Sequence, residues 1–144
     1  MIKICLKNLV VLVFALSLLF SGMSHAAAQP PGSGKDWPQH RGDPALRGLA
    51  PGKLGDKLKL LWTYETGEFV KSSAVVADGR VFIGSDSKKV HAADLKTGKE
   101  LWTFETELGI EAAPLVVGDV VYAGSTDGFL YALGTKDGKL RWKY

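Results

Sequence analysis

The sequence has 144 residues, of which 46% are hydrophobic and 23% are charged, with a formal net charge of +3 and one cysteine. Residues 1–28 hold two lysines and no acidic residue, so the net charge of the remainder is +1. This balance, without a clustered Lys/Arg stripe, argues against nucleic-acid binding. The cysteine, Cys5, lies within residues 1–28, so a chain lacking this segment folds without disulfides.

Residues 1–28 have the pattern of an export signal. Lys3 and Lys7 precede an apolar stretch at 9–20, and three alanines at 26–28 form a small-residue cleavage site. As a helix, this stretch extends about 18 Å, against roughly 30 Å of membrane hydrocarbon. We therefore expect a cleaved signal peptide and no stable membrane span, rather than an uncleaved anchor. Cys5 lies ahead of the apolar stretch, so no lipid anchor is indicated, and the protein is expected in the periplasm, at the outer membrane or outside the cell.

A leader without a packing pattern follows the signal. Residues 29–35 read Gln-Pro-Pro-Gly-Ser-Gly-Lys, which is typical of a flexible spacer. Residues 36–44 are polar and rich in turn formers around Trp37. We predict a flexible leader over 29–57, with no regular structure before Leu58.

From Leu58 onward the sequence is repetitive. Trp62, Trp102 and Trp142 are evenly spaced, and Leu-Trp-Thr-Tyr-Glu-Thr at 61–66 returns as Leu-Trp-Thr-Phe-Glu-Thr at 101–106. A period near 40 made of short β-rich runs is typical of a propeller blade with four strands per repeat. The Gly-His and Trp-Asp dipeptides of WD-type blades do not occur.

Alternating residues and turn signals predict an all-β chain of two four-stranded antiparallel blades, at 72–105 and 112–144. Residues 58–66 are predicted to form an orphan outer strand, because no first, second or third strand precedes them. The predicted blade strands cover residues 73–77, 80–85, 89–94, 99–105, 113–117, 120–125, 129–134 and 139–144.

The segment Ala-Ala-Asp-Leu-Lys-Thr-Gly-Lys-Glu-Leu-Trp at 92–102 resembles the tryptophan-docking repeat of pyrroloquinoline quinone (PQQ)-like propellers, A-x-D-x-x-T-G-x-x-x-W. The five positions that match are Ala92, Asp94, Thr97, Gly98 and Trp102. The second copy is degenerate and keeps Ala132, Gly138 and Trp142. The resemblance covers about residues 58–144 and implies the N-terminal section of a seven- to eight-bladed propeller. It extends to quinoprotein dehydrogenases and to the propeller subunits of outer-membrane β-barrel assembly machinery.

The motif residues have evident physical roles in such a repeat. Gly98 and Gly138 supply the positive φ of a tight turn between the third and fourth strands. Asp94 is expected to accept hydrogen bonds from N–H groups of that turn. The tryptophans, flat and with one N–H donor, suit a position between adjacent blades.

Two functional classes follow from the resemblance. A quinoprotein oxidoreductase would need PQQ, calcium, a catalytic Asp and often a vicinal Cys pair. Residues 29–144 contain no Cys and no Asn, and the acids at 86, 119, 127 and 137 fall in predicted surface turns. No catalytic, cofactor or metal residue is therefore assigned, and the enzyme remains the alternative.

The favoured class is a non-catalytic scaffold that binds a protein partner through loops at one end. Lys71 and Glu111 occupy equivalent positions, each shortly before a first strand, and are the candidate residues at the rim of the central channel. The alternative is that they are ordinary solvated charges, or that they form an ion pair with each other that stabilises the fold by well under about 1 kcal/mol. His91 matches Tyr131 in the repeat, which favours strand packing over metal binding.

The predicted strand total of nine is not a multiple of four. We therefore expect the chain to be a section of a longer propeller, with blade faces that the remaining blades, or other copies through self-association, would cover.

Overall fold

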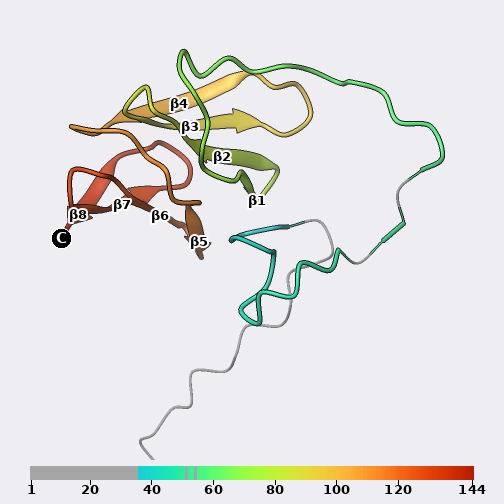
Figure 1. The fold of residues 1–144 in the computed structure, drawn as a ribbon, viewed down its shortest axis with the longest axis horizontal. Helices are drawn as coiled ribbons and strands as arrows, with labels where there is room; N and C mark the ends of the chain where they lie inside the picture. The colour runs from blue at the N-terminus through green and yellow to red at the C-terminus, as the bar shows by residue number, and fades with distance from the viewer. Residues whose placement is uncertain (1–35, 51, 54) are drawn as a thin grey trace, which may run out of the picture. The chain divides into compact units, whose positions relative to one another are not determined.

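The structure is a computed structural model that describes residues 36–50, 52–53 and 55–144, and it forms two antiparallel four-stranded sheets (Figure 1). The predicted signal peptide and the first part of the predicted leader lie outside these residues. Over the part of the chain that is described, no helix is long and apolar enough to cross a membrane. The prediction of an all-β chain with two blades is confirmed.

Each sheet is one repeat, with its strands in chain order. The first blade contains β1 (Val75–Ala77), β2 (Arg80–Gly84), β3 (Lys89–Asp94) and β4 (Glu100–Glu105). The second blade contains β5 (Leu115–Val117), β6 (Val120–Gly124), β7 (Leu130–Gly134) and β8 (Leu140–Lys143). Every strand lies inside its predicted range and differs from it by at most two residues at an end.

The tight turns between strands use residues that tolerate a positive φ. Asp78 and Gly79, between β1 and β2, have φ of 50° and 70°. Both central residues of this two-residue hairpin thus have the backbone that matches the twist of the flanking strands. Gly98 and Gly138, between the third and fourth strands, have φ of 69° and 66°, as predicted.

A β-bulge follows the motif alanine in both blades. The register between β3 and β4 shifts between Ala92 and Ala93, and that between β7 and β8 shifts between Ala132 and Leu133. In each case the alanine is paired with the motif tryptophan, as Ala92 with Trp102. A small residue opposite the indole leaves room for the large ring on the crowded face of the sheet.

The two blades share one hydrophobic core. Its fully buried members include Val75, Phe82 and Val90 of the first blade and Val121 and Leu133 of the second. Between the blades, Ile110 is completely buried against Gly84, where a Cβ would overlap the isoleucine side chain. The blades therefore pack face to face rather than lying as independent sheets.

Residues 58–66 do not form the predicted outer strand. Both described sheets are complete with four strands, so this segment has no neighbouring strand to supply ladder hydrogen bonds. Burial still alternates along it, with Trp62, Tyr64 and Thr66 partly buried between exposed residues. It is an extended chain that packs through side chains on the first blade.

The described part of the leader contains no strand, but it pairs with the first blade at one point. Trp37 forms an isolated antiparallel bridge with Val76 of β1. A strand at the edge of a sheet presents unpaired N–H and C=O groups, and this short piece of leader satisfies them.

Candidate functional site

Two of the three evenly spaced tryptophans, Trp62 and Trp102, each dock on the turn between the third and fourth strands of the blade that follows them. The Trp102 indole donates its Nε1–H to the carbonyl of Thr135 at 3.1 Å, and Trp62 donates to the carbonyl of Leu95 at 3.0 Å. A Cβ on Gly138 would lie 2.6 Å from the Trp102 ring, and one on Gly98 the same distance from Trp62. The turn glycine thus serves both the positive φ and the close approach of the indole.

The turn under Trp62 is organised by Asp94. Its Oδ1 accepts hydrogen bonds from Lys96 N at 3.0 Å, Thr97 N at 2.8 Å and Thr97 Oγ1 at 2.8 Å. These bonds, that of the Thr97 hydroxyl first, lower the pKa of the Asp94 carboxyl. The carboxylate thereby caps the turn in the way expected for this residue.

The second turn reaches the same shape with a different acid. Gly134 replaces the aspartate, and Asp137, in the position of Thr97, accepts a hydrogen bond from Lys139 N at 3.2 Å. A Cβ on Gly134 would overlap the Asp137 carboxylate, so the glycine makes room for the displaced acid. The degenerate motif is therefore a local substitution of one capping acid for another.

Trp142 has no such docking partner among the described residues, and 45% of its surface is exposed, against 8% for Trp102. It contacts Tyr122 of its own blade, with ring centroids 5.7 Å apart. Nothing lies within 4 Å of a Cβ built on Gly124, whereas the equivalent Gly84 is filled by Ile110. One face of the second blade is thus open in the described structure.

A hydrogen-bonded chain lies beside the Trp62 contact. Tyr64 Oη donates to Glu100 Oε2 at 2.6 Å and lies 3.1 Å from His91 Nδ1. Because the single Tyr64 proton is directed to the carboxylate, His91 Nδ1 must carry the proton that it shares with the Tyr64 oxygen. His91 Nε2 then accepts from a serine hydroxyl, with Ser85 Oγ at 3.0 Å and Ser87 Oγ at 3.3 Å.

Burial shifts the pKa values of the side chains in this hydrogen-bonded group. His91 is 4% exposed, and desolvation lowers its pKa, which keeps the ring neutral. Desolvation and the bond to the Glu100 carboxylate both raise the pKa of Tyr64. Ser85 is fully buried, so the Ser–His pair is a packing network with no room for a substrate. This agrees with the strand-packing role expected for His91.

The candidate rim residues lie together. Lys71 Nζ is 3.0 Å from Glu111 Oε1 and 3.0 Å from Asp86 Oδ2. These hydrogen bonds, that to Asp86 first, raise the pKa of Lys71. The pairing of Lys71 with Glu111 is one of the alternatives that the sequence leaves open, but the sequence places Asp86 only in a surface turn. The repeat alignment carries no signal for Asp86, because the equivalent residue in the second repeat is Thr126.

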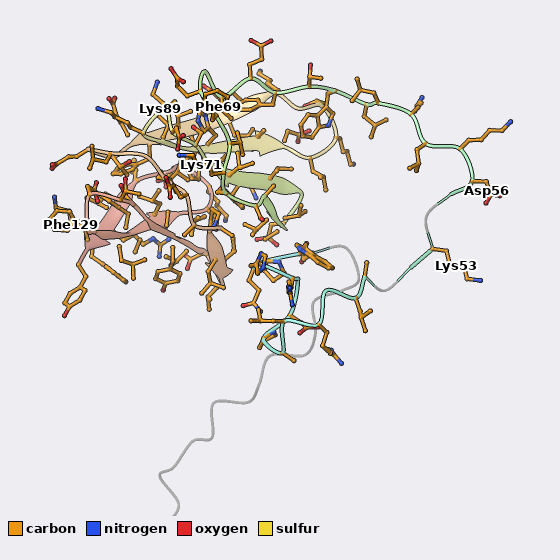
Figure 2. The ribbon with its side chains drawn as sticks, in the orientation of Figure 1. Lys53, Asp56, Phe69, Lys71, Lys89 and Phe129 are labelled. Atoms are coloured by element: carbon orange, nitrogen blue, oxygen red, sulfur yellow. The ribbon has the colours of Figure 1, made fainter. Side chains whose placement is uncertain are left out.

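The ion pairs hold together loops at one end of the blades. We define the loop surface as residues 67–72, 85–88, 106–112 and 125–129. Backbone bonds connect these loops, from Asp86 N to Phe69 O at 2.9 Å and from Thr126 N to Gly109 O at 2.9 Å. Large apolar side chains are exposed on the loop surface: Phe69 at 77%, Leu108 at 47% and Phe129 at 36%. Figure 2 labels Phe69 and Lys71 on the loop that precedes β1.

The remaining turn acids have local partners. Asp119 accepts from Arg141 at 2.6 Å, a bond that lowers the pKa of Asp119. Asp127 accepts from Tyr131 Oη at 2.8 Å, and desolvation, followed by this bond, raises the pKa of Tyr131 to about 12. Within residues 36–144 as described, no three His, Cys, Asp or Glu side chains are grouped to hold a metal ion.

Comparisons with known proteins agree with this architecture. The family model described as outer membrane protein assembly factor BamB matches residues 55–144, which is more than half of the chain. A comparison with curated proteins gives no match.

Two solved structures illustrate the likeness. BamB from Moraxella catarrhalis is 27% identical, with a TM-score of 0.54 over 58% of this chain and 26% of that one. Quinohemoprotein alcohol dehydrogenase from Comamonas testosteroni is 28% identical, with a TM-score of 0.66 over 76% of this chain and 19% of that one. The chain therefore spans about a quarter or less of the length of either protein. On the family match and the two blades, the chain belongs to the PQQ-like β-propeller family represented by the outer membrane protein assembly factor BamB model.

Proposed function

We propose that this chain is a section of an exported, non-catalytic propeller scaffold that binds a protein partner through its loop surface. The observation that carries the proposal is the ion-paired group of Lys71, Asp86 and Glu111, which fixes loops of both blades beside exposed Phe69 and Leu108. Exposed aromatic and aliphatic side chains beside charged groups are the composition of protein-binding surfaces. Loops held by a rigid scaffold are common positions for such sites.

The family description supports a role in outer-membrane protein assembly, and the pattern of residues 1–28 supports export. We propose domain limits of 1–28 for the signal peptide, 29–57 for the leader and 58–144 for the propeller section. N-terminal sequencing of the protein recovered from cells tests the first limit. A mature chain that begins at Gln29 is expected, and an intact Met1 in the mature protein contradicts export by cleavage.

Site-specific photocrosslinking in cells tests the binding role. A photoreactive residue at Phe69 or Leu108 should crosslink to a component of the outer-membrane assembly machinery. Matched positions at Asp78 and Lys96, in exposed turns at the other end of the strands, should not. Equal crosslinking at both ends, or none at the loop surface, contradicts the proposal.

The open face of the second blade suggests a second kind of partner. Trp102 docks on Gly138 of the following turn, whereas Trp142 is 45% exposed and nothing lies within 4 Å of a Cβ built on Gly124. We propose that further blades of the same type cover Trp142 and Gly124. A chain of residues 29–144 made alone should then self-associate through this apolar face, as an open head-to-tail contact allows. A monodisperse monomer with a sharp cooperative melt contradicts this.

A quinoprotein oxidoreductase section is the alternative, favoured by the similarity to the Comamonas testosteroni enzyme over 76% of this chain. Since the described residues do not form a metal site, no catalytic step is derived from them. Adding PQQ and calcium to the protein distinguishes the two. The scaffold predicts an unchanged absorption spectrum and melting temperature, and a saturable shift in either supports the oxidoreductase.

A further inference from the structure

The first strands of both blades are hydrogen-bonded to the same segment of the leader. Val76 of β1 accepts from Trp37 N at 2.7 Å and donates to Trp37 O at 2.8 Å. Val116 is the equivalent residue of the second repeat, in β5, and its amide donates to Pro38 O at 2.7 Å. Two successive leader carbonyls thus bind the same repeat position in two consecutive blades.

The positions of these bonds place the leader on the free edges of the sheets. β1 and β5 are the end strands of their sheets, each paired on one side only, with β2 and β6. The groups of Val76 that bind Trp37 are therefore directed away from β2. Trp37 and Pro38 therefore lie along the free edges of both sheets.

The sequence Trp-Pro suits this place chemically. Trp37 both donates and accepts, and so forms a two-bond bridge with β1. Pro38 has no N–H, so it accepts from Val116 and cannot return a bond to β5. Proline also fixes an extended backbone on the residue before it, which preorganises Trp37 for strand pairing.

The rest of the leader folds back and holds the indole. Gly42 has a φ of 81°, and a Cβ there would lie 2.7 Å from the Trp37 ring. Gly42 N donates to Gln39 O at 2.9 Å, and Gly48 N donates to Arg41 O at 3.1 Å. Residues 39–48 thus form a small folded unit beside the Trp37 ring.

We propose that the free edges of β1 and β5 form a binding site for an extended peptide with a Trp-Pro core, and that residues 37–38 of this chain are its resident occupant. Strand edges bind peptides through main-chain hydrogen bonds, with side-chain pockets for specificity. A segment of the same chemistry supplied by another molecule can then replace the leader along these edges. This site is separate from the loop surface and does not depend on a partner there.

Amide hydrogen exchange in the full chain tests the proposal through Val76 and Val116. Gly42→Val places side-chain atoms where the Trp37 ring lies and keeps the Trp-Pro sequence itself. Both amides should exchange at least about tenfold faster in this variant, a tenfold change corresponding to about 1.4 kcal/mol. Gly48→Val is the matched control, because Gly48 also has a positive φ, of 69°, and no atom lies closer than 4.0 Å to its Cβ, and it should change neither amide.

A peptide of residues 36–48, added to the Gly42→Val protein, should restore the protection of both amides in a saturable way. The same peptide with Trp37→Gly should not. Unchanged protection of Phe82 and Val121 in the core shows that the variant remains folded, and Trp37→Ala replaces it if it does not. The proposal is overturned if Val76 exchanges slowly in both Gly42→Val and Trp37→Ala. It is also overturned if the peptide does not restore protection at millimolar concentration.

Discussion

The two tryptophan dockings of this molecule share their backbone geometry and differ in what surrounds them. Trp62 and Trp102 each lie so close to a turn glycine that a Cβ built there would be 2.6 Å from the ring, and each donates to a turn carbonyl. Beside Trp62 the contact is a polar chain through Tyr64 and His91, whereas beside Trp102 it is the apolar pair of Phe104 and Tyr131, with ring centroids 5.6 Å apart. The docking of the indole therefore depends on the backbone of the turn, and it tolerates different side chains next to it.

The two dockings also differ in how the indole is anchored. Trp102 belongs to β4, which is bonded along its length to β3, while the Trp62 segment has no ladder bonds. The docking between the blades thus stabilises the common core, and the docking of residues 61–66 stabilises one segment. We expect the same substitution to have a global effect at the first and a local effect at the second.

Removing the indoles gives the largest contrast. Trp102→Ala should lower the free energy of unfolding by about 3–5 kcal/mol, as for other buried tryptophans, because it opens the core between the blades. Trp62→Ala should cost clearly less, since it releases an extended segment. Urea unfolding followed by circular dichroism measures both, and equal losses would contradict the distinction.

Filling the turn glycines should have the next largest effect. Gly138→Ala brings a Cβ into the Trp102 ring and strains a positive φ, whereas Gly118→Ala strains a φ of 58° with nothing within 4 Å. The difference between the two variants isolates the clash and should be roughly 1–3 kcal/mol in thermal or urea unfolding. The pair Gly98→Ala and Gly79→Ala repeats the comparison at Trp62, where a smaller difference is expected.

Removing the capping acids should have a smaller effect. Asp94→Ala takes three hydrogen bonds from its turn, and Asp137→Ala takes one from the equivalent turn. The melting temperature should therefore fall more for Asp94→Ala than for Asp137→Ala, and less for either than for Gly138→Ala. A larger fall for Asp137→Ala would show that the degenerate turn depends more on its acid than the geometry indicates.

The smallest effect should be a pH dependence confined to the Trp62 docking. Burial lowers the pKa of His91 below its usual value of 6.5, so the released state binds a proton more readily than the docked one. The docking stability that depends on neutral His91 is complete above pH 6.5 and is lost as the pH falls below it toward the lowered pKa. Exchange of the Trp62 indole proton should accelerate over this range, while that of Trp102 should not.

A control for this pH effect is to introduce the side chains found beside the Trp102 docking at the equivalent positions beside the Trp62 docking. Ser87→Asp with His91→Tyr reproduces the bond between Asp127 and Tyr131 of the second blade. The pH dependence of Trp62 exchange between about pH 7 and 5 should then disappear. If it persists, a group other than His91 is responsible for the pH dependence.

Much of the fold could be predicted because it is periodic. The even spacing of the motif tryptophans placed both blades, and the turn signals Asp78-Gly79 and Gly118-Asp119 placed the hairpins. The failed strand at 58–66 shows the limit of this reasoning. Its side chains alternate as in a strand, but a ladder also needs a neighbour, which is a property of the tertiary structure.

The contacts between repeats were less visible in the sequence, although one constant offset describes them. Trp62 meets Gly98 and Trp102 meets Gly138, and the same offset joins Tyr64 to Glu100. Once the contact of Trp62 with Gly98 is known, the same offset predicts the contact of Trp102 with Gly138 and that of Tyr64 with Glu100. The pairing of Trp37 with Val76 follows no repeat, so no periodic signal could have indicated it.

Hydrogen exchange of the indole N–H groups, followed by NMR at neutral pH, tests the graded docking most directly. The Trp102 proton is bonded to Thr135 in the core, the Trp62 proton is bonded to Leu95 at a partly buried position, and Trp142 is 45% exposed. We predict that protection falls in the order Trp102, Trp62, Trp142. Equal protection of Trp142 and Trp102, or an unprotected Trp102, would contradict it.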